Sequence, residues 1–247
     1  MAAKATIKPS EQRKLHTKSG NRCAMCKVVL VDEDNPSAAC IGENAHIYGE
    51  KPDAARYDVT KPDEVVNREG NLIFLCCNCH KKVDTDVGSY PPDKLFELKA
   101  QHEAWVVQTL EEQSANYTFA DLEVLATYLV ENNGIPALPN DYTILKIGDK
   151  MKKNSLDEVQ TYINMGLSRV ITIEDYINRN PDPNFAGRLT NAMSGRYQEL
   201  KAQNMESIDI FYALWDVASG EQKEFNYKAA GLGILVYFFE KCEVFEK

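Results

Sequence analysis

Two pairs of cysteines are the side chains of this sequence with the clearest chemistry. In each pair two residues separate the cysteines, and this spacing lets two sulfurs from one tight turn reach the same metal ion. The four sulfurs belong to Cys23, Cys26, Cys76 and Cys79. Four thiolates form a closed tetrahedral zinc site, which stabilises a fold but leaves no open position for catalysis. We expect a structural Zn²⁺ ion here, with buried free cysteines as the alternative.

The remaining cysteines are not expected to be ligands. Cys77 competes with Cys76, but only Cys76 has two residues between itself and Cys79. Cys40 and Cys242 are predicted to be small apolar core residues. The N-terminus has no apolar stretch typical of a signal peptide, and no apolar run reaches the roughly 18 residues that span a bilayer. We therefore expect a cytoplasmic protein with reduced thiols and no membrane contact.

A second group of side chains has the types needed for proton transfer and divalent-ion binding. His80 and Asp84 are four residues apart, so on a helix they share one face and can share an ion. The imidazole of His46 can accept a proton from water near neutral pH. Asn71 opens the apolar run NLIFLC and adds a side-chain amide to this group.

The charge is unevenly distributed along the chain. The net charge of -9 argues against bulk attraction to nucleic acid, but residues 1–31 hold seven basic side chains and one acidic one. Residues 1–115 carry a net charge of -3 and residues 116–247 one of -6. The predicted DNA contacts are Lys18, Arg22, Lys27 and Arg56. The alternatives are a solvated basic face for the N-terminal stretch and a surface ion pair for Arg56.

The apolar pattern predicts a mixed first half of the chain. We expect helices over Glu11–Thr17, Asn78–Val83 and Asp93–Glu112, a buried strand over Asn71–Cys76, and strand-like pieces near Ala38–Ile41 and Ala45–Tyr48. A long loop, rich in Asp, Glu, Asn, Pro and Gly, separates the first cysteine pair from the buried strand.

Helical patterns dominate after about residue 115. The expected helices cover Phe119–Glu131, Tyr142–Lys152, Phe185–Gln203 and Ser207–Val217, with others starting at Ser155 and Glu221. Glu158 would complete a capping box with Ser155. Residues 229–239 are apolar on nearly every side, which predicts a buried central helix or an interface helix. We predict an α+β protein with domains at 1–115 and 116–247, the second all-α, joined by a linker at 113–117.

The site residues resemble those of the HNH endonucleases, a family with a ββα-metal core. The likeness rests on His46, on the run from Asn71 to His80 and on Asp84, all bracketed by the two cysteine pairs, and it covers about residues 10–112. It implies that His46 is the general base and that Asn71 fixes its loop. It also implies that His80 and Asp84 hold a catalytic Mg²⁺, Mn²⁺ or Ni²⁺ ion.

Two positions depart from the family pattern. Many members carry an acidic or histidine metal ligand directly before the base, where this chain has Ala45, and many end the motif in histidine, where it has Asp84. Another carboxylate, such as that of Glu43, can then enter the metal shell. His16 and His102 are expected to be structural.

The end of the chain is similar to C-terminal helical regions of effectors in bacterial ABC three-component conflict systems. The similarity covers Leu232–Phe239 and the charged ending that follows. It implies docking onto a small middle-component protein and an SMC/ABC-type ATPase. A helical-bundle core or a homodimer surface would explain the same pattern.

Taken together, these features predict a metal-dependent endonuclease that hydrolyses double-stranded DNA in antiviral defence. The alternative is a catalytically inactive, zinc-stabilised adaptor that binds DNA or protein.

Overall fold

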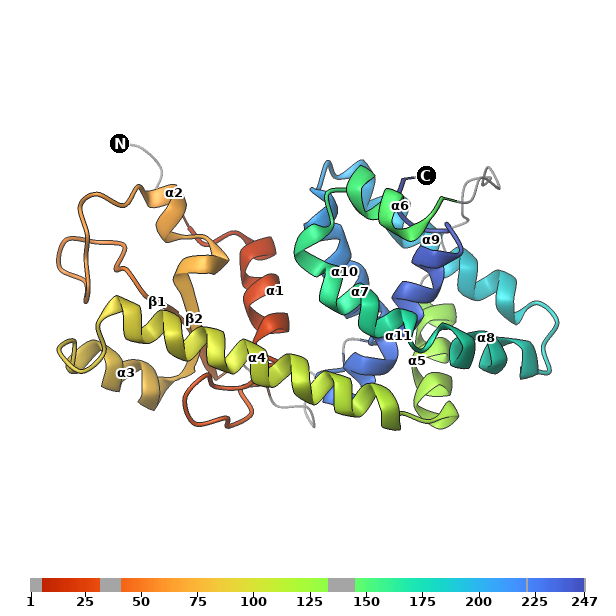
Figure 1. The fold of residues 1–247 in the computed structure, drawn as a ribbon, viewed down its shortest axis with the longest axis horizontal. Helices are drawn as coiled ribbons and strands as arrows, with labels where there is room; N and C mark the ends of the chain where they lie inside the picture. Colours follow the sequence, from red (N-terminus) through yellow and green to blue (C-terminus); the bar gives the residue numbers. More distant parts are fainter. Residues whose placement is uncertain (1–5, 32–40, 133–144, 221, 247) are drawn as a thin grey trace. The chain divides into compact units, whose positions relative to one another are not determined.

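The computed structural model describes residues 6–31, 41–132, 145–220 and 222–246 (Figure 1). The chain divides into two compact units, Met1–Gln108 (unit 1) and Thr109–Lys247 (unit 2). The elements show an α+β protein, because unit 1 contains a small sheet and the described part of unit 2 is helical. None of the described helices is both long enough and apolar enough to cross a membrane.

Unit 1 is built around a two-stranded sheet. Its elements are helix α1 (Pro9–Lys18), strand β1 (Gly42–His46), helix α2 (Asp63–Val66), the 3₁₀ turn η1 (Glu69–Asn71), strand β2 (Leu72–Cys76) and helix α3 (Cys77–Thr85), followed by helix α4 (Pro92–Asn116), which continues into unit 2. The predicted buried strand and the helix after it are thus both present. In Figure 1 the two strands lie side by side, and α3 follows β2 directly.

The sheet fixes the position of the candidate base. The strands are antiparallel, with His46 opposite Leu72 and Gly42 opposite Cys76. Leu72 to Leu75 are all buried, which matches the continuous apolar run in the sequence. Position 42 requires glycine, because a Cβ there would lie 2.2 Å from the ring of Phe74. Packing of β2 in the core therefore fixes the strand register, which places His46 at the end of β1.

Buried Glu69 connects the first helix to the last helix of unit 1. Lys18 on α1 contacts one carboxylate oxygen at 3.1 Å, and Lys99 on α4 contacts the other. Burial raises the pKa of this carboxyl, but the two ammonium groups outweigh it and hold the pKa below its ordinary value. The pair of contacts ties α1 and α4 together beneath the sheet.

Unit 2 is a helical assembly. After the last turns of α4 it contains helices α5 (Phe119–Asn132), α6 (Ile147–Lys153), α7 (Gln160–Leu167), α8 (Val170–Arg179), α9 (Phe185–Ala202), α10 (Ser207–Ala218) and α11 (Phe225–Glu240), and a 3₁₀ turn, η2 (Asp157–Val159). Helix α11 packs against α5, α7, α8 and α10 (Figure 1).

The apolar C-terminal segment is the central helix of unit 2. Eleven of the sixteen residues of α11 are buried. Helix α7 approaches it closely at Gly166, where a Cβ would lie 2.5 Å from Val236. The sequence allowed a core helix or an interface helix, and this burial makes α11 a core helix of unit 2.

Several local expectations differ from the structure. The capping box at Ser155 is wrong: Ser155 has a φ of 52°, and α7 begins at Gln160 without a side-chain cap. Residues 113–116 of the expected linker form the last turn of α4, and the division between units falls at Gln108. Three predicted features, the strand-like residues 38–40 with Cys40, the helix start at 142–144, and Glu221, lie outside the described residues. Cys242 is buried, as predicted.

Candidate metal centre and adjoining pocket

The four predicted cysteine ligands come together in unit 1. Their sulfur atoms all lie within 4.8 Å of one another. Cys26 and Cys76, from different pairs, have their sulfurs 3.8 Å apart. Tetrahedral zinc with Zn–S bonds of about 2.3 Å requires sulfurs about 3.8 Å apart, so the cluster has the size of a zinc site. The tetrad of Cys23, Cys26, Cys76 and Cys79 can therefore hold a structural metal ion such as zinc.

Local backbone geometry presents these sulfurs. The first pair sits in a turn in which Lys27 adopts a φ of 62° and its N–H donates to the carbonyl of Cys23 at 2.9 Å. The N–H of Ala24 donates to the carbonyl of Phe74 at 2.9 Å, which fixes the turn to β2. The second pair spans the junction of β2 and α3, where the N–H of Cys79 lies 3.4 Å from the sulfur of Cys76. Two rigid segments thus deliver two ligands each.

The thiols differ in how readily they ionise. Burial raises the pKa of Cys23, but nearby backbone N–H groups stabilise its thiolate and bring the pKa down to about 7. Burial and the neighbouring thiols raise the pKa of Cys79 instead. A bound metal cation would stabilise all four sulfurs as thiolates. Cys77 is exposed and lies outside the tetrad. Cys76 belongs to the tetrad, as the two-residue gap to Cys79 predicted.

His46 is held by an amide that the sequence analysis did not single out. Its Nε2 lies 3.1 Å from Oδ1 of Asn67, whose Nδ2 donates to the carbonyl of Asp63 at 3.2 Å and to Glu50 at 3.4 Å. These two donor contacts fix the orientation of the amide, so Asn67 presents an acceptor to the imidazole. In a neutral imidazole this contact favours the tautomer with the proton on Nε2, which leaves Nδ1 as an acceptor.

Asn71 fixes the backbone that follows His46. Its Oδ1 accepts the N–H of Tyr48 at 3.0 Å, and its Nδ2 donates to the carbonyls of Tyr48 at 3.0 Å and Val66 at 2.9 Å. These contacts are the ones that the sequence analysis expected from the amide. Since Asn71 is buried, the loop is held without competition from water.

His80 lies between two carboxylates. Its Nδ1 is 2.7 Å from Glu43, and its Nε2 is 3.2 Å from Asp84 on the same helix. A neutral imidazole carries one N–H and can donate to only one of them. Adjacent ligands of an ion with bonds of about 2.1 Å lie about 3.0 Å apart, close to the spacing of Nε2 and Asp84. His80, Asp84 and Glu43 thus offer one nitrogen and two carboxylates at distances that suit either hydrogen bonds or a shared divalent ion.

The side chain of Arg56 is buried, whereas a side chain that binds DNA phosphate must reach solvent. Its side chain is only 2% exposed. The guanidinium donates to the carbonyls of Ile47 at 2.9 Å, Val83 at 2.7 Å and His46 at 3.3 Å, and to Asp84 at 2.5 Å. Arg56 thereby connects the end of β1 to α3 and orients the Asp84 carboxylate.

The same side chains line one pocket. His46, His80 and Asp84 surround a space of about 220 Å³ together with the loop residues Gly49, Glu50, Lys51, Ala54, Ala55 and Arg56. Lys51 is exposed and brings a positive charge to the rim. Ala45, in contrast, is 1% exposed and packed in the core of unit 1. Ala45 is therefore not among the residues that line this pocket.

The predicted basic contacts of the N-terminal stretch are engaged within unit 1. Lys18 pairs with Glu69, and Arg22 donates to the carbonyl of Lys27 at 3.5 Å. Lys27 donates to the carbonyl of Ala24 at 3.1 Å and contacts Nδ1 of buried His102 at 2.5 Å. These contacts stabilise the fold around the cysteine tetrad, so the geometry gives no support for a DNA face formed by them.

His16 and His102 are structural, as expected. The ring of His16 stacks on Phe74 at 4.2 Å and contacts Asn44 at 2.9 Å. His102 lies 2.9 Å from the carbonyl of Ser19, and burial together with Lys27 lowers its pKa to about 4.

Comparison of the chain with protein-family models and with curated proteins finds no match. The likeness to HNH endonucleases and to conflict-system effectors therefore remains a prediction from the residues. What stands independently is a two-stranded sheet followed by a helix, beside four cysteines that can hold a metal ion.

Proposed function

We propose that unit 1 is a metal-dependent HNH-type endonuclease domain that hydrolyses phosphodiester bonds of double-stranded DNA. The observation that carries the proposal is the convergence of His46, His80 and Asp84 on one pocket at the end of β1. A proton acceptor and a pair of divalent-ion ligands in one small space are the minimum that such hydrolysis needs.

The residues divide the work as follows. Asn67 holds His46 so that Nδ1 can accept a proton from the attacking water. Arg56 holds the carbonyl of His46, and Asn71 holds the backbone of Tyr48, two residues later. His80 and Asp84 would hold the divalent ion, which when bound polarises the phosphoryl oxygen and stabilises the leaving oxygen. Lys51 at the rim supplies a positive charge for the DNA backbone.

The cysteine tetrad has a separate task. A zinc ion with four thiolates is coordinatively complete, so it stabilises the junction of β2 and α3 rather than taking part in hydrolysis. Because α3 also carries His80 and Asp84, this junction positions the two residues that would hold the divalent ion. Loss of the structural metal should therefore remove both fold and activity.

Unit 2 would regulate the nuclease. The likeness of its C-terminal region to conflict-system effectors supports docking onto a small middle-component protein and an SMC/ABC-type ATPase in cytoplasmic antiviral defence. Because α11 is buried, that docking must use other surfaces of unit 2. Co-purification of the full chain with the proteins encoded beside it tests this part, and absence of any complex contradicts it.

The nuclease proposal is tested with supercoiled plasmid and Mg²⁺, Mn²⁺ or Ni²⁺, with and without those neighbouring proteins. We expect nicking by the wild-type chain and its loss in His46→Ala and Asp84→Ala, while Asp53→Ala, an exposed acid of the same loop region, retains it. Equal nicking by wild type and His46→Ala, or no nicking under any condition, contradicts the proposal.

A catalytically inactive adaptor is the second candidate, favoured by the buried Ala45 in place of a usual ligand. It predicts DNA or protein binding that is unchanged in His46→Ala, without cleavage.

A further inference from the structure

Unit 2 contains a pocket that the proposed nuclease does not use. It has a volume of about 630 Å³ and is lined by residues from the end of α4, from α7 and from the α7–α8 junction, namely Glu111, Ser114, Ala115, Thr161, Asn164, Met165, Ser168 and Arg169. Small-molecule sites in proteins typically measure about 300–1,000 Å³. A bare inorganic ion would fill only a small part of this space.

Arg169 is the most informative residue of this pocket. Arg179, Arg188 and Arg196, the other arginines of unit 2, each pair with a carboxylate. Among the described residues Arg169 has no ion pair with a carboxylate, and its Nε, like that of Arg196, is buried without a hydrogen-bond partner. Its positive charge acts on Tyr117, where it opposes the rise in pKa that burial causes. The ring of Tyr117 lies 4.8 Å from the guanidinium carbon.

An arginine that lines a pocket without a carboxylate partner can bind an anion there. The cation–π contact with Tyr117 positions the guanidinium, whose N–H groups can donate to the two oxygens of a carboxylate or phosphate. A buried donor without a partner costs about 1–3 kcal/mol, and such a group in a native fold calls for an explanation. A ligand oxyanion in the pocket would supply the missing charge and acceptors.

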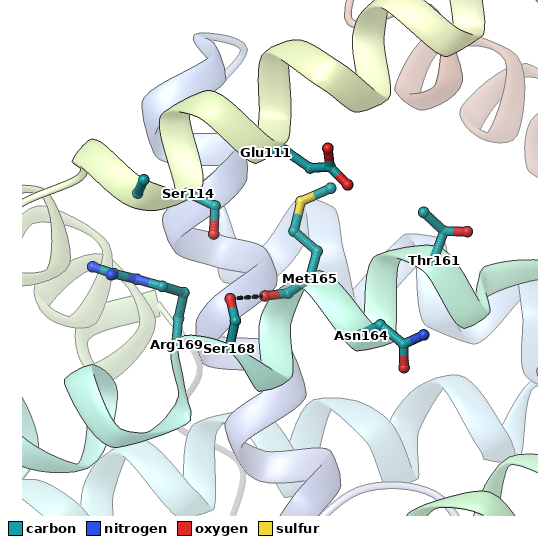
Figure 2. A pocket seen from close by; sticks show the side chains of 8 residues that line it. Glu111, Ser114, Thr161, Asn164, Met165, Ser168 and Arg169 are labelled. Carbon is teal, nitrogen blue, oxygen red and sulfur yellow. Dashed lines mark hydrogen bonds between the residues drawn. The ribbon is translucent and has the colours of Figure 1, made fainter.

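The rest of the lining indicates an organic ligand. Figure 2 shows Arg169 at one side of the labelled residues and Thr161 and Asn164 at the other, with Glu111 beside Met165. Thr161 and Asn164 are exposed and add donors. The hydroxyl of Ser168 donates to the carbonyl of Met165 at 2.7 Å, so its oxygen is left as an acceptor. Glu111 would repel a second anionic group and accept a donor.

We propose that this pocket binds a small organic molecule with an oxyanion, held by Arg169, and a hydrogen-bond donor that faces Glu111. The proposal concerns unit 2 alone and does not depend on nuclease activity. The oxyanion can belong to a phosphate monoester or to a carboxylate, and the probes below separate the two.

Isothermal titration of the full chain tests the proposal with three probes: inorganic phosphate, adenosine 5′-monophosphate and L-glutamine. We expect one of the two organic probes to bind and inorganic phosphate to bind more weakly. Arg169→Met should weaken that binding at least about tenfold, since a hydrogen bond to a charged group contributes about 1.5–3 kcal/mol. Arg188→Met is the matched control and should bind as wild type does.

Asn164→Asp provides a second variant that leaves the interior unchanged, because Asn164 is exposed. The added negative charge should also weaken binding. Preference for the monophosphate assigns a phosphate site, and preference for glutamine a carboxylate site. The proposal is overturned if neither organic probe binds at millimolar concentration, if phosphate alone binds, or if Arg169→Met and Asn164→Asp bind like wild type.

Discussion

Replacing Arg56 by methionine separates a structural role from a DNA-binding one. The side chain is 2% exposed and donates to three backbone carbonyls, two of which belong to the fully buried residues Ile47 and Val83. In Arg56→Met these carbonyls lose their partner. A phosphate-binding arginine would instead face solvent, and its loss would leave the fold intact.

The expected cost follows from these contacts. A hydrogen bond from a charged donor contributes about 1.5–3 kcal/mol, and losses within one network are not additive. The contact with Asp84, which is 41% exposed, adds little. We expect Arg56→Met to lower the free energy of unfolding of unit 1 by about 3–5 kcal/mol.

Native-state hydrogen exchange measures this cost in unit 1 alone. A loss of this size should speed exchange of the β2 amides, Leu72–Cys76, about 100- to 5,000-fold, because 1.4 kcal/mol corresponds to a factor of ten. Amides of α11 in unit 2 serve as the internal reference. Arg68→Met, at an exposed position of the same unit, is the control variant. Unchanged exchange together with weaker DNA binding would refute the structural role.

Two further predictions concern unit 1. Cys79→Ser should lose one equivalent of zinc by elemental analysis and unfold unit 1, whereas Cys77→Ser, outside the tetrad, should retain both metal and fold; full zinc content in Cys79→Ser would show that the ligand set is wrong. Because the pKa of His102 is lowered from 6.5 to about 4, the unfolded chain binds a proton first as pH falls. The stability contributed by neutral His102 is thus complete above pH 6.5 and lost as pH falls toward 4, by about 2 kcal/mol between pH 6.5 and 5. His102→Asn should flatten this dependence in urea unfolding at constant zinc content, and an identical pH profile would contradict the assignment.

The parts of the site that the sequence could predict depend on local spacing. A two-residue gap places two sulfurs in one turn, and four residues on a helix place His80 and Asp84 on one face, whatever surrounds them. The apolar run before Cys76 similarly predicts a buried strand. The amide of Asn71 was predictable because a buried polar group beside a strand must bond nearby backbone.

The contacts that the sequence does not reveal are those between distant segments. The sequence suggests that Arg56 is a surface cation, but contacts with the end of β1 and with α3 bury it. Lys18 reads as a DNA contact, yet buried Glu69, fifty-one residues later, pairs with it. The contact between His46 and Asn67 was not predicted from the sequence, because loop conformation rather than spacing brings the two side chains together.

The rate of plasmid nicking by zinc-replete His46→Ala, relative to wild type, tests the central claim most directly. A general base contributes about 10²- to 10⁴-fold, so the variant should be slower by that factor at neutral pH with its zinc content and β2 exchange unchanged. Nicking at the wild-type rate by a zinc-replete, folded His46→Ala protein would contradict the assignment of this pocket as the catalytic site.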